Sequence, residues 1–334
     1  TYYNKNIPKY ESCFRVLFNG EKYDIKKFLK DHPGGVKTLR KYGGKNIAQA
    51  MTAFDHSTSA YHMMRDFKVD SEISDVNLTG KVSANGRLVI KEEAGRKAEE
   101  INLLEELELD WSKPLLGQLH TIAPHYDLWI NSAVYRTCRL FSSPLLESLT
   151  STPWYLVPMF WVPIILYLGT SQFLEQYCGH LVFGIVTWTA LEYSLHRWVF
   201  HLNPGSSLTV IKIHFLIHGL HHKTPFDGLR QVFPPIPALV IAGIIYTPFR
   251  TVTEHPLIKM TGGLIGYLTY DMIHYYVHHG SPRDGSYLYK MKRYHSNHHF
   301  ESVFVPAFGI STNIWDHVFK TFVQVRKLGF SLHW

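Results

Sequence analysis

The stretch SLTSTPWYLVPMFWVPIILYLGTSQFL, from Ser148 to Leu174, contains no charged side chain. It is longer than the roughly 20 apolar residues that a helix needs to cross the hydrocarbon layer of a bilayer. Its Trp and Tyr residues are typical of a membrane interface, and its prolines are better tolerated in membrane helices than in soluble ones. The stretch therefore predicts a transmembrane helix over about 150–170. The alternative is a buried helix of a soluble all-α protein.

Three further stretches with few charges follow this one along the chain. They predict additional spans over about 177–197, 231–249 and 259–279. If the amino-terminal region is cytoplasmic, four crossings return every histidine-rich segment to the cytoplasmic side. The loop 171–179 has no Lys or Arg and the tail 280–334 has seven, which agrees with the positive-inside rule. We expect 115–334 to form an all-α four-helix transmembrane domain with a cytoplasmic histidine-rich cap.

The composition excludes several other classes of protein. Only 18% of residues are charged, against roughly 25% in soluble domains. The 20 Phe, 20 Tyr and 8 Trp residues provide enough apolar surface to exclude disorder over most of the chain, and three distant cysteines exclude a disulfide scaffold. The net charge of +7 is dispersed, without a basic run, so we expect no nucleic-acid partner. The anomaly is the 21 histidines, because imidazole is the commonest metal ligand in proteins.

Two histidines in the amino-terminal part have the pattern of a haem site. His32 begins the tetrapeptide HPGG, and His56 follows it 24 positions later. Two neutral imidazoles can occupy both axial positions of a haem iron, and glycines allow the backbone to approach a flat ring closely. The sequence therefore predicts a haem bound by His32 and His56. His62 is the alternative second ligand.

This part of the chain resembles the cytochrome b5 family. The resemblance lies in the HPGG tetrapeptide, the second histidine and the preceding strand-like FRVLFNGEKYDIKKFLKD, and it covers residues 8–80. It implies a small α+β domain that binds haem b and transfers electrons. We expect residues 81–114 to be a helical or flexible linker without chemistry.

Four histidine clusters occur in the rest of the chain, as HRWVFH, HFLIHGLHH, HYYVHH and HSNHH. Residues three or four apart share a face of an α-helix. His196 and His201 are five apart, about 140° around a regular helix, so we expect the chain to leave the helix between them. The candidate ligands are His196, His201, His218, His221, His222, His274, His278, His295, His298 and His299. His214 and His279 are alternatives that stay open.

Ten imidazoles are too many for a single zinc site, which takes three or four protein ligands. We therefore predict a two-metal centre. Ligands that are all nitrogen favour redox-active iron that handles O2 over a hydrolytic zinc pair, although zinc can replace iron in such sites on isolation. Glu192 and Asp271 are the carboxylates among the clusters, and we expect them to hydrogen-bond the ligand imidazoles.

The four clusters, each beside a predicted span, resemble those of the fatty acid hydroxylase superfamily of membrane di-iron enzymes. The match covers residues 120–325. The fusion to a cytochrome b5-like domain, with HGLHHKTPFDGLRQVFPP at 218–235, resembles the branch that hydroxylates carbon 2 of fatty acyl chains for ceramides and other sphingolipids. By this resemblance the ten histidines are ligands of two non-haem irons, and O2 is the co-substrate.

The resemblance also implies partners and a location. A reductase that uses NAD(P)H supplies electrons through the haem, and the lipid substrate is a fatty acid, an acyl thioester or a ceramide. The chain is expected to be a multi-pass protein of the endoplasmic reticulum membrane, with both active domains on the cytoplasmic face.

Two other functions stay open at this point. An acyl or sterol desaturase or methyl oxidase of the same superfamily would use similar histidine clusters. A membrane-anchored electron-transfer haem protein would use the histidines only to bind structural zinc. Analysis of the lipid products separates these possibilities.

Overall fold

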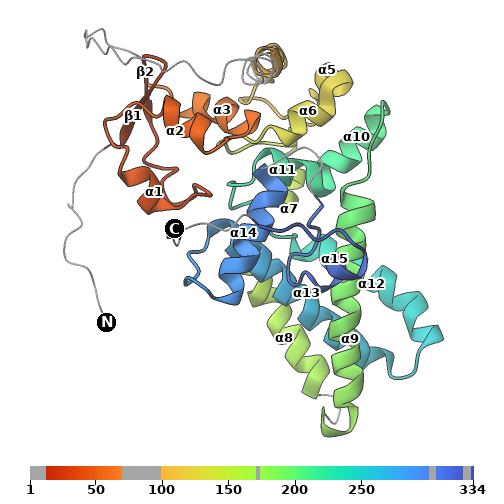
Figure 1. Ribbon diagram of the computed structural model, residues 1–334. Helices are drawn as coiled ribbons and strands as arrows, with labels where there is room; N and C mark the ends of the chain where they lie inside the picture. The colour runs from red at the N-terminus through yellow and green to blue at the C-terminus, as the bar shows by residue number, and fades with distance from the viewer. Residues whose placement is uncertain (1–12, 70–98, 171–173, 301–305, 326–331) are drawn as a thin grey trace.

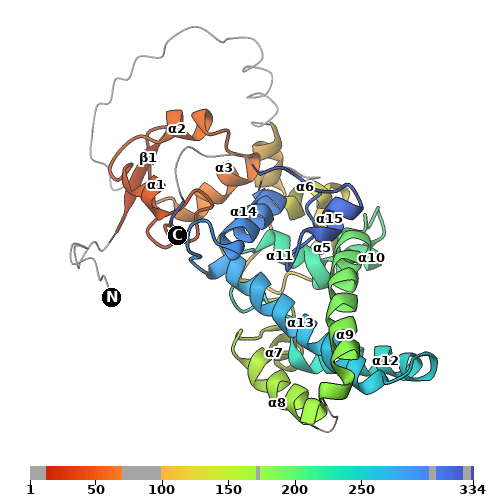
Figure 2. The same cartoon turned by 60° about the horizontal axis from the view of Figure 1, so that its bottom comes forward.

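The computed structural model describes residues 13–69, 99–170, 174–300, 306–325 and 332–334. A small α+β domain lies at one end of the molecule (Figure 1). The helices α8, α9, α12 and α13 project from the opposite end, and α11 and α14 lie between these two parts in both views (Figures 1 and 2).

The small domain begins with an antiparallel hairpin of β1 (Arg15–Phe18) and β2 (Glu21–Asp24). Asn19 and Gly20 form its turn and both have positive φ, which is the backbone that a two-residue hairpin turn requires. The helical elements that follow are α1 (Val36–Arg40), α2 (Ala48–Ala53), α3 (Thr58–Met64) and the 3-10 turn η1 (Arg65–Phe67). Val16, Ile25 and Met63 are among the buried side chains of its core.

All the secondary-structure elements described in the larger domain are helices or helical turns. These are α5 (Leu119–Ile122), η2 (Ala123–His125), α6 (Tyr126–Asn131), α7 (Pro144–Thr150), α8 (Leu156–Thr170), α9 (Leu174–Leu195), η3 (His196–Phe200), α10 (Leu208–His214), η4 (Phe215–Gly219), α11 (Leu220–Lys223), α12 (Pro235–Val252), α13 (Pro256–His279), α14 (Tyr287–Phe300) and α15 (Ile314–Val318). The predicted combination of a small α+β domain with a helical domain is confirmed.

A long helix lies within or close to each predicted span. The first, α8, begins at Leu156 and not near residue 150, because the chain turns at Pro153 after α7. Within the described residues, α12 alone has the length (18 residues) and hydropathy (1.3) of a membrane crossing, and α8 is a shorter apolar helix. Four crossings and a cytoplasmic cap therefore stay predictions.

The segment predicted as a linker, 81–114, lies partly outside the described residues. From residue 99 onward it is described, and residues 99–106 are helical. Leu104 and Leu109 are buried in a core with Leu119 of α5 and Trp129 of α6. The second half of this segment is therefore packed against the larger domain.

The helices α9 and α13 approach each other closely at two glycines. A Cβ atom on Gly184 would lie 2.1 Å from the carbonyl oxygen of Lys259, and one on Gly262 would lie 2.1 Å from that of Leu181. Small residues at such positions allow helix backbones to touch, as is common in membrane proteins. Since α9 and α13 both lead into histidine clusters, this contact fixes the relative position of those clusters.

We expect Gly184→Ala to destabilise the protein by about 1–3 kcal/mol or more, because the helices must separate to admit the methyl group. The measurement is the thermal unfolding midpoint of the detergent-solubilised protein. Gly263→Ala is the matched control, since the nearest atom to its Cβ is 4.0 Å away. Equal midpoints for the two variants would contradict the close contact.

Candidate metal and haem centres

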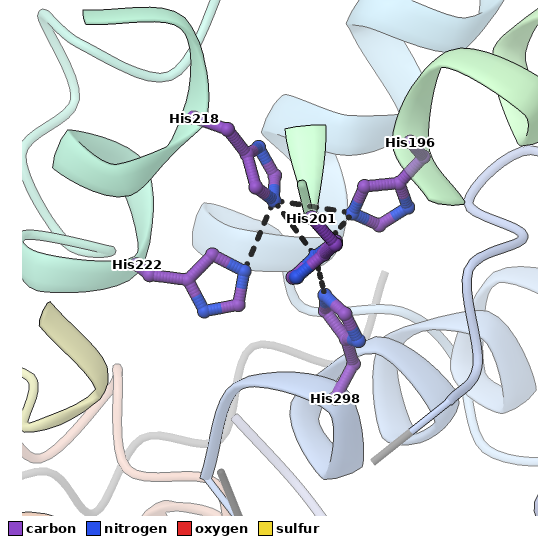
Figure 3. Close-up of side chains that lie close together, drawn as sticks. All are labelled: His196, His201, His218, His222 and His298. Atoms are coloured by element: carbon purple, nitrogen blue, oxygen red, sulfur yellow. Dashed lines mark hydrogen bonds between the residues drawn. The ribbon is translucent and has the colours of Figure 1, made fainter. Parts of the chain in front are cut away.

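Five imidazoles from three segments of the chain point toward one spot and form the first histidine group, which consists of His196, His201, His218, His222 and His298 (Figure 3). The distances between their Nε2 atoms are 3.2 Å for His196 and His218, 3.0 Å for His201 and His298, and 3.0 Å for His218 and His222. All five candidate ligand atoms lie within 4.8 Å of one another. Four of the five side chains are buried, and His201 is half-buried.

Hydrogen bonding alone does not account for this arrangement. Nε2 of His201 lies 3.0 to 3.2 Å from the Nε2 atoms of three other rings, those of His196, His218 and His298. A neutral imidazole nitrogen offers either one proton or one lone pair, so it can satisfy one such partner. A shared cation satisfies all the lone pairs at once.

Five further imidazoles form the second histidine group, which consists of His221, His274, His278, His295 and His299. All five are buried. Their Nε2 atoms are 3.0 Å apart for His221 and His274, and 2.8 Å apart for His278 and His295. The ring nitrogens Nδ1 of His221, His295 and His299 have no hydrogen-bond partner within the described structure.

The two groups adjoin each other. The rings of His222 and His299, one from each group, stack with centroids 4.3 Å apart. His218, on the turn before α11, belongs to the first group, and His221, on α11, belongs to the second. The centroids of these two rings are 5.5 Å apart. The ten histidines predicted to converge therefore do so, as two contiguous sets of five.

The division follows the helical register. His218 and His222 are four apart and share the first group, whereas His221 lies between them in sequence and joins the second. On α14, His295 and His299 share the second group and His298 joins the first. Each of these helices therefore supplies both groups, which keeps the groups side by side.

The prediction that the chain leaves the helix between His196 and His201 is confirmed, because the α-helix α9 ends at Leu195 and the helical turn that follows it ends at Phe200, before His201. The segment η3 is a π-helical turn, and the amide of His201 donates to the carbonyl of His196 at 3.1 Å. A π-turn pairs residues five apart, so both rings reach the same group. A second π-turn, η4, precedes α11 and carries His218.

Contacts with the backbone fix one ring and one helix end beside the groups. Nδ1 of His196 lies 2.5 Å from the carbonyl oxygen of Phe308, which leaves Nε2 free to face the group. Lys292, buried on α14, donates to the carbonyls of His278 and Gly280 at 3.1 Å each. No motif in the sequence marked Phe308 or Lys292.

The prediction that Glu192 and Asp271 hydrogen-bond the ligand imidazoles is wrong. Glu192 accepts from the amides of Ile310 and Ser311, at 3.1 and 2.7 Å, and thereby holds the loop that contains Phe308. Asp271 accepts from the amide of Phe233 at 3.2 Å. Both carboxylates therefore hold loops around the site in place. They accept hydrogen bonds from backbone amides that would lower the stability of the fold if they were buried without a partner.

The electrostatics of the groups keep the rings in the form that binds metals. Burial holds the pKa values of His218, His221 and His222 well below the ordinary value, and the neighbouring rings lower them further. These imidazoles are therefore neutral at pH 7, and the neutral form has the lone pair that a metal needs.

The geometry fits a metal in each group. Two nitrogens that are each about 2.1 Å from one ion lie about 3 Å apart at a right angle and about 4 Å apart on opposite sides. The observed separations of 2.8 to 3.2 Å match the first of these values. A donor set of nitrogen alone suits a transition metal such as iron, copper or zinc.

A cavity of about 110 Å³ opens beside the first group. His201, His218 and His298 line it together with the polar side chains Asp127 and Asn203. The first group therefore borders space that is large enough for a small molecule or part of a larger one.

The alternative ligands lie outside both groups. His214 lines the cavity, and its Nδ1 lies 2.8 Å from the hydroxyl of Tyr126. His279 contacts the ring of Tyr275 with centroids 4.7 Å apart. His180 and His255 contact each other, with His180 16 positions before His196 and thus about 24 Å away along the helix.

In the small domain, His32 and His56 face each other with ring centroids 6.1 Å apart and an interplanar angle of 28°. Nδ1 of His56 lies 3.0 Å from the carbonyl oxygen of Met51, which fixes the orientation of this ring. Gly34 is required beside this pair, because a Cβ atom there would lie 2.7 Å from the ring of His32.

This spacing fits a haem iron between the rings. Nitrogens bound about 2 Å from an ion on opposite sides, with each centroid about 1 Å farther out, place the centroids about 6 Å apart. Nδ1 of His32 is buried without a hydrogen-bond partner within the described structure. His62 does not take part in this pairing, and its Nδ1 lies 3.4 Å from a guanidinium nitrogen of Arg65.

His62 is expected to make stability depend on pH. Burial, together with the nearby cations Lys223, Arg65 and Arg136, lowers its pKa to about 3, while Glu105 and Glu108 pair with Arg65. The unfolded chain, with a pKa near 6.5, binds the proton first, so stability is lost as pH falls below about 6.5.

Between pH 7 and pH 5, we expect the free energy of unfolding to fall by about 1–2 kcal/mol less in His62→Gln than in the unsubstituted protein. The measurement is the unfolding midpoint of both proteins across this range. Parallel pH profiles for the variant and the unsubstituted protein would contradict the buried, neutral state of His62.

Two family models match the chain. Residues 181–321 match the fatty acid hydroxylase family and residues 5–71 match the cytochrome b5-like haem/steroid binding domain. The chain is 37% identical to fatty acid 2-hydroxylase of Rattus norvegicus, over 90% of this chain and 89% of the relative. The chain belongs to the fatty acid 2-hydroxylase family. It is therefore a hydroxylating oxidoreductase with a haem-binding domain, and the predicted family and domain fusion are confirmed.

Relatives of this family from plants and fungi match as well. Dihydroceramide fatty acyl 2-hydroxylase of Arabidopsis thaliana is 37% identical over 66% of this chain and 96% of the relative. The ceramide very long chain fatty acid hydroxylase of Saccharomyces cerevisiae is 30% identical over 93% of this chain and 90% of the relative. A solved structure described as full-length scs7p, with only the hydroxylase domain visible, has a TM-score of 0.59 at 28% identity and covers 69% of this chain and 90% of that one.

Proposed function

We propose that this fatty acid 2-hydroxylase family member is a membrane di-iron monooxygenase that hydroxylates carbon 2 of acyl chains used in sphingolipids. The observation that carries the proposal is the pair of adjoining five-histidine groups. His196, His201, His218, His222 and His298 would hold one iron, and His221, His274, His278, His295 and His299 would hold the other. Bound iron would supply O2 activation at these two positions.

The reaction requires an external source of electrons. One C–H bond, one O2, two electrons and two protons give one C–OH group and one water. A reductase that uses NAD(P)H would provide the electrons, and a haem b held by His32 and His56 would carry them one at a time. The centroid separation of these rings, 6.1 Å, supports that role.

Backbone and side-chain contacts around the two groups hold the site in place before substrate arrives. The carbonyl of Phe308 and the amine of Lys292 hold His196 and the backbone at His278 in place. Rings fixed in this way bind a metal without rearrangement, which supports tight binding. The cavity beside the first group would admit the part of the lipid that carries carbon 2.

The exposed apolar faces of the long helices support a membrane location. Only 6% of α12 is buried, although its 18 residues have a mean hydropathy of 1.3. Large side chains on α8 and α9 are also exposed, such as Tyr167 (74%) and Phe183 (54%). An apolar surface of this extent is stable in lipid and not in water. We propose four spans in the endoplasmic reticulum membrane, with both active domains on the cytoplasmic face.

The names of the relatives suggest in which chemical form the acyl chain reaches the enzyme. Two of them are named for ceramide and dihydroceramide, and others for the fatty acid itself. We propose that the substrate is an acyl chain presented as a fatty acid, an acyl thioester or a ceramide at the cytoplasmic interface.

The test is expression in a host that lacks 2-hydroxy lipids, followed by mass spectrometry of its sphingolipids. We expect 2-hydroxylated acyl chains with the intact protein and none with His298→Ala. New double bonds without 2-hydroxy acids would replace the proposal with a desaturase. An unchanged lipid profile, with a haem that still exchanges electrons, would replace it with an electron-transfer protein.

A further inference from the structure

The core of the small domain continues into the larger domain. Ala133 is buried in the same cluster as Met63 and Phe67, and Tyr135, Phe226 and Phe300 pack against that cluster. All four of these side chains come from the larger domain. The two domains therefore share one apolar core.

A polar contact borders this shared core. The carboxylate of Asp66, in the small domain, accepts from the guanidinium of Arg136 at 2.5 Å and from the amide of Tyr135 at 2.8 Å. The hydroxyl of Tyr135 donates to the carboxylate of Asp31 at 2.8 Å. The side chain of Asp66 is 4% exposed, so its charge is shielded from water and needs these partners.

The loop that begins with His32 is also held from the other side. The amide of Val36 donates to the carbonyl of His333 at 2.6 Å. The amide of Leu332 donates to the hydroxyl of Tyr289 on α14, and Trp334 packs edge-to-face against the ring of Tyr289 with centroids 5.4 Å apart. The segment 332–334 therefore connects this loop to the helix that carries three of the ten histidines.

Almost no space separates the His32 loop from the second histidine group. Pro33 and Asp31 on one side and His278 and His295 on the other line a cavity of about 10 Å³. A cavity of this size holds about one water molecule. The loop therefore lies directly over the second group.

Aromatic rings connect the two sites without interruption. Centroids are 5.6 Å apart for His32 and Phe28, and 5.6 Å apart for Phe28 and Phe226. Phe226 stacks on Phe300 at 5.7 Å with an interplanar angle of 8°, and Phe300 lies 5.8 Å from His299. Phe226 thus contacts Phe28 of the small domain on one side and Phe300 of α14 on the other.

We propose that this docked arrangement is the working position of the haem domain, and that Phe226 and Asp66 are positioning residues that hold the His32 loop over the second histidine group. The role in electron delivery rests on the proposed function, whereas the docked contact itself does not. Electron delivery then occurs within one chain across a preformed contact, and needs no search by a tethered domain. A large, partly apolar contact of this kind is what distinguishes a fixed domain from a mobile one.

The test uses the full chain with its haem and metals, and one variant from each side of the contact. Phe226→Ala removes the apolar bridge, and Asp66→Arg places two cations face to face. Phe319→Ala is the control for the first, because Phe319 stacks on Tyr193 at 5.3 Å, away from this contact. Glu21→Arg is the control for the second, since it makes the same charge change at an exposed site of the small domain.

The first measurement is hydrogen exchange of the peptide that covers residues 28–36. We expect exchange to become about tenfold faster in both interface variants and to stay unchanged in both controls. The second measurement is turnover with a reductase. We expect kcat to fall about tenfold with an unchanged KM for the lipid, an unchanged Soret spectrum and unchanged metal content, because only the delivery of electrons is slowed.

Either measurement can overturn the proposal. Equal exchange at residues 28–36 in all five proteins would show that the loop is not covered in solution. Faster exchange with an unchanged kcat would show that the docked position is not the working one. If the protected loop is found in a protein that makes no 2-hydroxylated lipid, the docked contact stands and the proposed function fails.

Discussion

His221→Gln is expected to reduce the formation of hydroxylated lipid by more than about 100-fold, because loss of a direct ligand exceeds the 10–100-fold effect of losing a partner of a ligand. His221 touches three other rings of the second group, with centroids 4.5 Å from His274, 4.7 Å from His278 and 4.5 Å from His299. A glutamine cannot replace its nitrogen in that position. We expect the purified variant to lose one metal ion per chain and to keep its haem spectrum.

The matched control for this variant is His279→Gln. It makes the same chemical change in a histidine that directly follows a member of the second group but lies outside both groups. We expect His279→Gln to keep two metal ions per chain. Loss of metal from both variants alike, or from neither, would contradict the assignment of His221 as a ligand.

His32→Ala is expected to remove the haem and to reduce turnover driven by NAD(P)H and a reductase by about 100-fold or more, since the proposed haem would lose one of the two imidazoles that would hold it and could no longer carry electrons. The two non-haem metals should be retained, because the histidine groups do not include His32. The measurements are the Soret absorbance, the metal content and the amount of product with a reductase present.

His62→Ala serves as the control for the haem site. His62 lies in the same domain and was the alternative ligand from sequence, but its ring faces Arg65 and not His32. We expect the Soret band of His62→Ala to match that of the unsubstituted protein. A normal Soret band in His32→Ala, or a lost band in His62→Ala, would overturn the pairing of His32 with His56.

The convergence of the ten histidines could be predicted because it depends on short-range spacing. Pairs such as His274 and His278 are one helical turn apart, and helices that enter and leave the same face bring such pairs together. The haem pair could be predicted for a similar reason, since HPGG requires a close backbone approach that Gly34 provides.

Which histidine belongs to which of the two groups could not be predicted from the sequence. His221 and His222 are neighbours in sequence and belong to different groups, which depends on the exact direction of each ring in three dimensions. The π-turn at η3 was also missed, because a π-turn differs from an α-helix by one residue per turn and leaves no pattern in a short segment.

Partners supplied by the backbone left no signal either. The carbonyl of Phe308 orients His196, and any residue type has a carbonyl at that position. The contact between the domains could not be predicted either. No local pattern marks Phe226 and Tyr135, and only the fold places their rings against Phe28. Long-range packing of this kind is set by the whole fold and not by local sequence.

The central claim, two adjoining metal ions with nitrogen ligands only, is tested most directly by X-ray absorption at the metal edge. The protein should carry both His32→Ala and His56→Ala, so that no haem iron contributes to the signal. We predict a first shell of imidazole nitrogens and a second metal ion close to each absorbing one, at two ions per chain. A first shell that contains carboxylate oxygens, or an isolated ion at one per chain, would contradict the account.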